Sequence, residues 1–321
     1  MKAEKFFTHP VGIAVAATVT TFLWGSSFPF IKKSYEHLQI GKSDIFEQML
    51  FAGYRFVLAA LGILLVMLLL RKQLGYQTGS LKRLVKVGAF QTFLQYIFFY
   101  IGLSYSSGIQ GSIIAGTTSF FQIILAHFMY KNDSLSIRKC VGLAIGFLGV
   151  IIVNLPSGGS MGITFGIGEI CLLAAMFCGG LGNILSKQEA AHLDILYLTS
   201  YQMLLGGLGL LAVGASQVGI MPFQFDWNTT LMLFYLAFIS GAGFVLWNNI
   251  MKYNKVGNVS MYLFLIPVFG VLLSSVMLQE AIHLVVIIAL VCVAGGIIIV
   301  NKQKSATSVK NAVQKAGKPI N

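Results

Sequence analysis

The chain has 321 residues, of which 56% are hydrophobic and only 10% are charged, and its formal net charge is +12. Soluble domains usually carry about 25% charged residues, so this chain cannot cover a water-facing surface. The composition excludes an ordinary soluble globular protein and indicates a protein of the lipid bilayer.

Ten apolar runs, each about long enough to cross a bilayer, follow one another along the chain. Backbone groups in lipid must be satisfied within the segment, so we expect an all-α integral membrane protein. The first run lacks the small-residue cleavage site of a secretory signal peptide and should remain as a span. The expected helices are 11–31, 46–70, 84–104, 111–130, 137–154, 165–186, 195–216, 229–251, 258–278 and 282–301.

The basic residues sort to one side of this arrangement. With both termini placed in the cytoplasm, 18 of the 22 Lys and Arg residues fall on the cytoplasmic side and three in the outer loops. This is the positive-inside bias of multi-pass proteins of the cell membrane. The net charge therefore reflects topology, and no nucleic-acid partner is expected. The Lys-rich segment 302–321 is predicted to be a disordered cytoplasmic tail close to anionic lipid.

Several function classes lack their sequence signals. All four cysteines fall inside expected spans, which argues against disulfides and against CxxC metal or redox sites. The sequence contains no HExxH, GxSxG or GxxxxGK[ST] motif, so an intramembrane enzyme and ATP-driven transport on this chain are disfavoured. We expect no cofactor, no metal and no catalytic residue.

The second half of the sequence repeats the first. Residues 54–64 align without gaps on residues 201–211, 147 positions later, so that Gly62 falls on Gly209. At the same spacing, residues 133–154 align on residues 280–301. In the second match Asp133 falls on Glu280 and Asn154 on Asn301.

Each copy holds five spans, and because five is odd the second copy must enter the membrane from the opposite side. Inverted repeats are typical of alternating-access transporters, whose substrate site lies between the repeats near the membrane midplane. We therefore divide the chain into a first five-helix repeat, 11–154, and a second, inverted repeat, 165–301.

Several short motifs occur in a fixed order: LWGSSF in the first span, YRF in the second and SYSSGIQGSII across the third and fourth. Acidic residues end the fourth and ninth spans, and Gly-rich fifth and tenth spans follow. Over about residues 11–301 the chain resembles the ten-helix EamA-type members of the drug/metabolite transporter superfamily. The resemblance implies cytoplasmic termini and, mostly, export of amino acids, metabolites or drugs. His127 and Asp133 depart from the family pattern.

The first span carries Trp24-Gly25-Ser26-Ser27 followed by Pro29. Small residues let a neighbouring helix or a ligand approach the backbone, Trp offers a flat wall, and Pro permits a bend. We expect Trp24, Gly25 and Ser27 to line a solute cavity. The alternative is an interfacial Trp beside closely packed helices.

Arg55 is the one basic residue well inside an expected span. An intramembrane charge is costly and is usually functional or structurally paired. It is a candidate for contact with a substrate carboxylate. The alternative is a structural clamp on backbone carbonyls or on Glu47.

A polar and aromatic stripe runs along the third span, with related side chains in the fourth and eighth. In lipid such side chains face protein or a water-filled path, either as cavity lining or as hydrogen bonds between helices. The lining would be aromatic and uncharged, which suits a neutral or zwitterionic organic solute. These candidates are Gln91, Gln95, Tyr96, Tyr100, Thr118, Gln122, Tyr201, Trp247, Asn248 and Tyr262.

The sequence therefore predicts a secondary transporter that exports a small organic solute through a cavity between the two repeats. Uptake of the same solute class is the alternative, and an enzyme or scaffold is a remote one. The expected partners are the solute and the bilayer. A face of Gly142, Gly146 and Gly149 predicts helix packing and leaves a homodimer contact open.

Overall fold

The computed structural model describes residues 2–130, 136–153 and 166–301. In these residues every regular element is a helix. Asp133 and the tail 302–321, for which we made predictions, lie outside the described residues. The helices are α1 (Lys2–Thr8), α2 (Pro10–His37), α3 (Ile45–Leu69), α4 (Ser80–Gly88), η1 (Ala89–Leu94), α5 (Gln95–Tyr105), α6 (Gly108–Ala115), α7 (Thr118–Met129), α8 (Ile137–Val153), α9 (Ile167–Glu189), α10 (Ile195–Val218), α11 (Trp227–Tyr253), α12 (Val256–Val259), η2 (Ser260–Phe264), α13 (Leu265–Leu278) and α14 (Leu284–Asn301).

The helices have the length and composition of membrane spans. Within the described residues, seven are long and apolar enough to cross a bilayer, counting α4–η1–α5 and α6–α7 as one each. The all-α membrane class is thus confirmed. Three expected spans correspond to the shorter helices α8, α13 with η2, and α14, so the exact number of ten remains a prediction.

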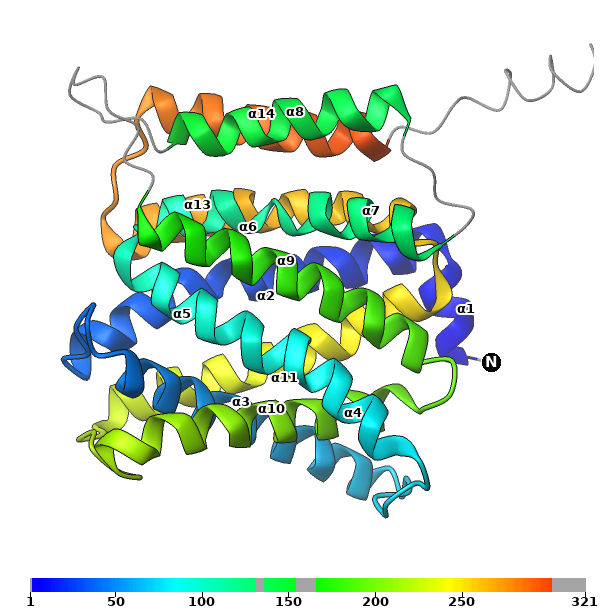
Figure 1. The fold of residues 1–321 in the computed structure, drawn as a ribbon, viewed down its shortest axis with the longest axis vertical. Coiled ribbons are helices and arrows are strands. Elements are labelled where there is room, and N and C mark those ends of the chain that lie inside the picture. Colours follow the sequence, from blue (N-terminus) through cyan, green and yellow to red (C-terminus); the bar gives the residue numbers. More distant parts are fainter. Residues whose placement is uncertain (1, 131–135, 154–165, 302–321) are drawn as a thin grey trace, which may run out of the picture.

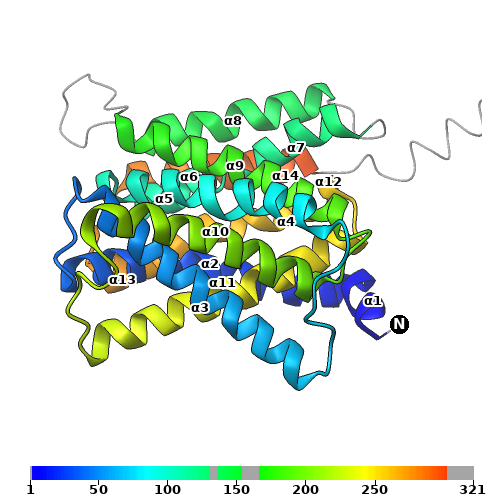
Figure 2. The same cartoon turned by 60° about the horizontal axis from the view of Figure 1, so that its bottom comes forward.

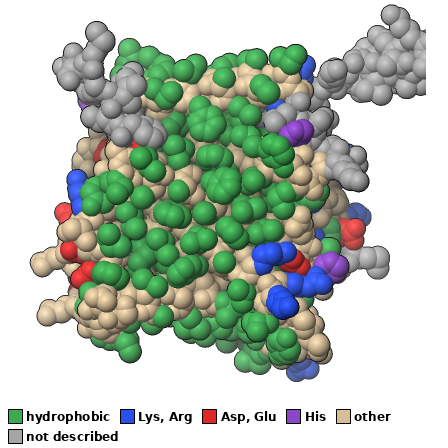
Figure 3. Space-filling view, in the orientation of Figure 1, with side chains coloured by type: hydrophobic (Ala, Val, Ile, Leu, Met, Phe, Trp, Pro, Cys, Tyr) green, Lys and Arg blue, Asp and Glu red, His purple; other side chains and the backbone are tan. Residues whose placement is uncertain are grey.

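The surface agrees with a membrane setting. On the face drawn in Figure 3, hydrophobic side chains cover the middle and charged ones gather toward two opposite ends. We call the end with α1 and the loops 70–79 and 190–194 the N end, and the end with the loops 38–44 and 219–226 the far end (Figure 1). At the N end, the Glu189 carboxylate accepts from Arg83 at 3.0 Å and from Lys86 at 2.5 Å.

Helices that align in sequence pack against each other. α3 packs along α10 at one edge of the bundle, and α8 packs along α14 at the opposite edge (Figures 1 and 2). Between these pairs, α2 contacts α11 and α13, while α9 contacts α5 and α7. Exchanging each helix for its counterpart in the other half of the sequence reproduces these contacts. The division into two inverted five-helix repeats stays a prediction.

The edge pair α8–α14 explains the glycine face of the fifth span. A Cβ atom on Gly296 of α14 would lie 2.5 Å from the carbonyl oxygen of Gly142 and 2.7 Å from the nitrogen of Gly146. Only hydrogen fits at this crossing. The face therefore packs within the chain, and a homodimer contact through it stays a prediction.

Three expected spans contain an irregular segment. The third contains the π-helical turn η1, the fourth is interrupted between α6 and α7, and the ninth starts with the short helices α12 and η2. At the second break, the hydroxyls of Thr117 and Thr118 donate to the carbonyls of Ile114 and Ala115. Such irregular turns are frequent at functional sites, and these three adjoin one cavity.

Candidate functional site

A small cavity of about 60 Å³ lies where helices from both halves of the sequence meet. None of its lining residues is Asp, Glu, Lys, Arg or His. The lining is therefore aromatic and uncharged. It consists of Trp24, Ser27 and Phe28 from α2, Gln95, Tyr96 and Phe99 from α5, Ala115 from α6, Thr118 from α7, Met176 and Asn183 from α9, Phe244 from α11, Leu263 from η2 and Ile266 from α13.

The size of the cavity shows that the structure is in a closed conformation. Sites for organic ligands usually measure about 300–1,000 Å³, whereas a single water needs about 10–15 Å³. A cavity of about 60 Å³ has room for a few water molecules but not for a metabolite. Admitting a solute requires the surrounding helices to move apart, and two polar clusters hold them together.

The first cluster lies on the N-end side of the cavity, because Gln91 and Asn248 lie nearer that end than the lining residues Gln95 and Phe244 of the same spans. The amide nitrogen of Gln91 donates to the side-chain oxygens of Asn183 at 2.8 Å and Asn248 at 3.2 Å. We call Gln91, Gln122, Asn183, Asn248 and Ser260 the amide cluster.

The amide cluster extends across the bundle. Asn183 donates to the oxygen of Gln122 at 2.8 Å, and Gln122 donates to the hydroxyl of Ser260 at 3.1 Å. All five side chains are buried, so each hydrogen bond is expensive to lose. Gln91 and Gln122 belong to the first half of the sequence and the other three to the second. The cluster therefore joins the halves.

The second cluster surrounds Arg55, which is only 1% exposed. Its Nε donates to the Ser240 hydroxyl at 2.7 Å and to the Leu236 carbonyl at 3.2 Å, and Nη1 donates to the Tyr100 hydroxyl at 3.1 Å. Leu236 and Ser240 of α11 lie nearer the far end than the cavity residue Phe244. The Arg55 cluster therefore joins α3 and α5 to α11 on the far-end side.

Two glycines leave room for the polar side chains of Trp24 and Gln95, which line the cavity. A Cβ on Gly243 of α11 would lie 2.6 Å from Nε1 of Trp24, and one on Gly179 of α9 would lie 2.8 Å from Nε2 of Gln95. Trp24 Nε1 and Gln95 Oε1 are both buried and lack a hydrogen-bond partner within the protein. Because buried polar atoms are nearly always paired, this donor and this acceptor are available to a bound molecule.

Five of the residues predicted from sequence lie on the cavity: Trp24, Ser27, Gln95, Tyr96 and Thr118. Gln91, Gln122 and Asn248 lie in the amide cluster, and Arg55 and Tyr100 lie in the Arg55 cluster. Trp247 is fully buried, with its ring centre 5.8 Å from that of Trp24.

Besides Trp247, three predicted residues lie neither on the cavity nor in the two clusters. Gly25 faces α13, where an added Cβ would lie 2.7 Å from the Cβ of Phe269. Tyr201 lies at the N end and donates its hydroxyl to the Leu74 carbonyl at 2.5 Å. Tyr262 is half-buried in η2.

Sequence reasoning missed the apolar part of the wall. In a sequence this rich in Phe, Leu and Ile, no signal separates a cavity residue from one that packs against another helix or lipid. The missed residues are Phe28, Phe99, Ala115, Met176, Phe244, Leu263 and Ile266. Among the described residues, no group of three or more His, Cys, Asp or Glu side chains could hold a metal ion.

A bundle of apolar helices that closes from two sides around an uncharged cavity defines a multi-pass membrane protein of the transporter class. The EamA-like transporter family model matches residues 11–155 and 166–302, and the chain belongs to this family.

Curated relatives support the same class. The uncharacterized transporter YoaV of Bacillus subtilis (strain 168) is 22% identical over 288 residues, which cover 89% of this chain and 96% of YoaV. A probable amino-acid metabolite efflux pump of Salmonella typhimurium is 25% identical, with 82% and 86% covered. One solved crystal structure has the same fold, with a TM-score of 0.65 at 16% sequence identity. The structural match covers 90% of this chain and 98% of the chain in that crystal structure. The chain is a membrane transporter.

Proposed function

We propose that the protein is a secondary transporter that exports a small neutral or zwitterionic organic solute, such as an amino-acid metabolite, by alternating access. The observation that carries the proposal is the uncharged central cavity held closed on both sides by clusters that join the two halves of the sequence. An uncharged wall favours a solute whose own charges cancel, because an isolated charge would be buried without a partner.

Alternating access requires the two sides to open in turn. The amide cluster joins the halves on the N-end side, and Arg55 and Tyr100 of the first half hold Leu236 and Ser240 of the second on the far-end side. Rocking the repeat 11–154 against the repeat 165–301 would break one cluster while the other holds. Inside the cavity, Trp24 Nε1 would donate to the solute and Gln95 Oε1 would accept from it.

The positive-inside bias supports a cytoplasmic N end in the cell membrane. Relatives from Salmonella typhimurium and Escherichia coli carry the name of probable amino-acid metabolite efflux pumps, which favours export from the N end to the far end.

The test is flux in sealed proteoliposomes that contain the purified protein and no ATP. A panel of labelled amino acids, their uncharged N-acetyl amide derivatives and aromatic drugs is loaded on one side. We expect saturable flux of at least one zwitterionic or neutral solute, and a Trp24→Ala variant should lose it while remaining folded. Absence of flux for the whole panel, or formation of a covalent product, would contradict the proposal.

A further inference from the structure

A second, larger cleft opens on the outer surface of the bundle between α3 and α11. Its volume is about 530 Å³, within the range of ligand sites. Large apolar side chains at its mouth, including Leu61, Phe234 and Phe238, are more than half exposed. The lining is formed by Leu58, Ala59, Leu61, Gly62, Ile63, Leu65, Val66, Leu196, Phe234, Ala237, Phe238, Gly241, Ala242 and Val245.

The cleft exists because side chains are absent where the two helices diverge. A Cβ atom added to Gly62 would meet no atom within 4 Å, and one added to Gly241 would meet only ordinary contacts. Gly209, which aligns with Gly62 in the second half, is instead covered by the ring of Phe93, 3.0 Å from its added Cβ. The matching place in the other half is therefore filled by protein.

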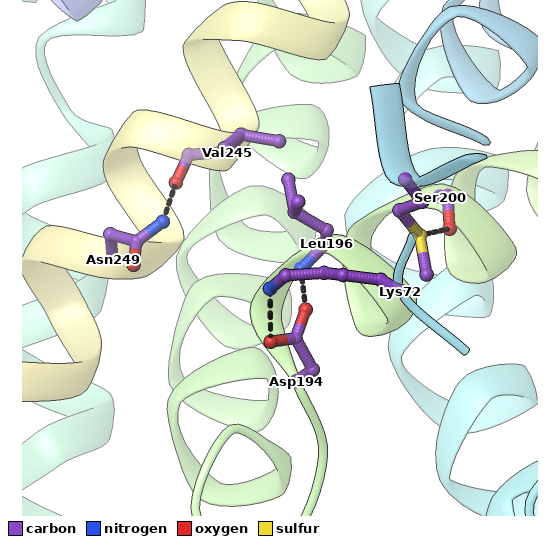
Figure 4. A network of polar contacts seen from close by, with 7 residues as sticks. Lys72, Asp194, Leu196, Ser200, Val245 and Asn249 are labelled. Atoms are coloured by element: carbon purple, nitrogen blue, oxygen red, sulfur yellow. Dashed lines mark hydrogen bonds and ion pairs between the residues drawn. The ribbon is translucent and has the colours of Figure 1, made fainter. Parts of the chain in front are cut away.

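The end of the cleft nearest the N end is polar. Leu196 lines the cleft, and its backbone N–H donates to Asp194 at 2.9 Å. Lys72 and Asp194 form an ion pair of 2.7 Å in which both side chains are partly exposed, at 39% and 46%. Figure 4 shows Lys72 and Asp194 beside Leu196, with Asn249 of α11 nearby. An apolar cleft thus ends in one positive and one negative group.

We propose that this cleft binds one zwitterionic glycerophospholipid, such as a phosphatidylethanolamine, from the leaflet at the N end. An acyl chain fills the cleft, the phosphate meets the Lys72 ammonium, and the headgroup ammonium meets the Asp194 carboxylate. The paired charges of the rim match the paired charges of this headgroup, whereas Asp194 repels a lipid with net negative charge.

The dimensions agree with one leaflet. At 1.5 Å per residue, the lining residues 58 to 66 of α3 span about 12 Å and the lining residues 234 to 245 of α11 span about 17 Å. One leaflet contributes about 15 Å of the roughly 30 Å hydrocarbon core. The lipid site and the solute cavity lie on different faces of α11, so the lipid proposal does not depend on the transported solute.

Native mass spectrometry of the purified protein in mild detergent tests the site, after addition of phosphatidylethanolamine or phosphatidylglycerol at equal concentration. Wild type should retain one phosphatidylethanolamine, with at least a threefold preference over phosphatidylglycerol. Gly62→Phe adds a side chain whose Cβ meets no atom within 4 Å, so that its ring can enter the cleft, and it should lower the retained fraction at least fivefold. Gly62→Leu should act in the same direction, and Asp194→Asn, which removes the negative charge of the rim, should remove the preference between the lipids. Leu272→Phe, at an exposed position of α13, is the matched control and should bind as wild type.

Equal lipid retention by wild type and both Gly62 variants would overturn the proposal, as would a preference for phosphatidylglycerol. Light scattering of the same samples tests a second copy as occupant. If wild type is a dimer and Gly62→Phe is a monomer, the cleft is a protein interface and the lipid assignment is wrong.

Discussion

The guanidinium carbon of Arg55, Cζ, lies 5.5 Å from the centre of the Tyr96 ring. Tyr96 is also one of the residues that line the cavity. Among the described residues, no carboxylate lies within ion-pair distance of Arg55, Glu47 included. Backbone and hydroxyl oxygens hold the cation instead, and two aromatic rings flank it. This arrangement agrees with the structural-clamp alternative for Arg55.

From this arrangement we predict that Arg55→Ala lowers the maximal transport rate more than the apparent affinity. A hydrogen bond to a charged group contributes about 1.5–3 kcal/mol. Loss of the Arg55 hydrogen bonds should therefore weaken the contact between α3, α5 and α11 that closes the far-end side. Initial rates over a range of solute concentrations separate Vmax from KM. Arg55→Lys, which keeps the charge, should fall between wild type and Arg55→Ala. A KM that rises only for carboxylate-bearing solutes would show that Arg55 touches the solute.

The two glycines beneath Trp24 and Gln95 give a second prediction. Gly243→Ala places a methyl group 2.6 Å from Trp24 Nε1, and Gly179→Ala places one 2.8 Å from Gln95 Nε2, so both wall side chains must shift. We expect each variant to raise KM at least threefold and to change thermal stability little, because alanine favours helices. Gly62→Ala, in open space, serves as the control. Unchanged KM in both variants would remove Trp24 and Gln95 from the solute site.

A third prediction concerns the amide cluster. Asn183→Leu has similar volume but removes the bonds to Gln91 and Gln122, and an unpaired buried amide costs about 1–3 kcal/mol. The N-end side should therefore open more often. The measurement is labelling of a Thr118→Cys cavity reporter by a membrane-impermeant thiol reagent, in a background without native cysteines. Labelling from the N end should rise severalfold, whereas labelling from the far end should fall or stay constant.

The sequence predicted the helices well wherever one apolar run makes one straight helix. The span expected at 46–70 is α3, Ile45–Leu69, and the one expected at 229–251 lies inside α11, Trp227–Tyr253. The prediction that the first helix ends at residue 31 was wrong, because α2 continues through Lys32 and Lys33 to His37. Hydropathy indicates where lipid ends, whereas backbone hydrogen bonding continues into water.

The site was predictable only in part. Polar and aromatic side chains stand out in an apolar sequence, which is why Trp24, Gln95 and Thr118 were predicted, and all three line the cavity. Sequence alone could not separate the cavity wall from the clusters on either side, because Gln91 and Gln95 lie one turn apart on the same span. Which of the two side chains reaches the cavity depends on the π-helical turn at Ala89–Leu94. It also depends on glycines of other helices, such as Gly182, which packs against Gln91.

Glu280 gives a fourth prediction. We interpreted it from sequence as a boundary residue, yet its two carboxylate oxygens accept from the backbone N–H groups of Gly108 and Ile109, each at 2.8 Å. A residue of the second half thus caps α6 of the first half, where a negative charge also complements the helix dipole. Glu280→Ala should lower the free energy of unfolding by about 1–2 kcal/mol, as loss of a helix cap does. Glu280→Gln keeps one acceptor and should lose about half of that, measured by thermal unfolding in detergent.

The last prediction concerns pH and Asp194, the N-cap of α10. Burial alone would raise the pKa of this carboxyl, but the hydrogen bond and charge of Lys72 and the backbone N–H of Leu196 outweigh it and lower the pKa. A carboxyl whose pKa is lowered by folding stabilises the protein above the unfolded value, about 3.9, and loses this effect as pH falls through the folded value. Asp194→Asn should therefore unfold at a lower temperature than wild type at pH 7. Because the pair is half exposed, the difference should be only about 0.5–1 kcal/mol. It should shrink steadily below about pH 4, and a constant difference from pH 7 to pH 3 would show that the ionised carboxylate contributes nothing.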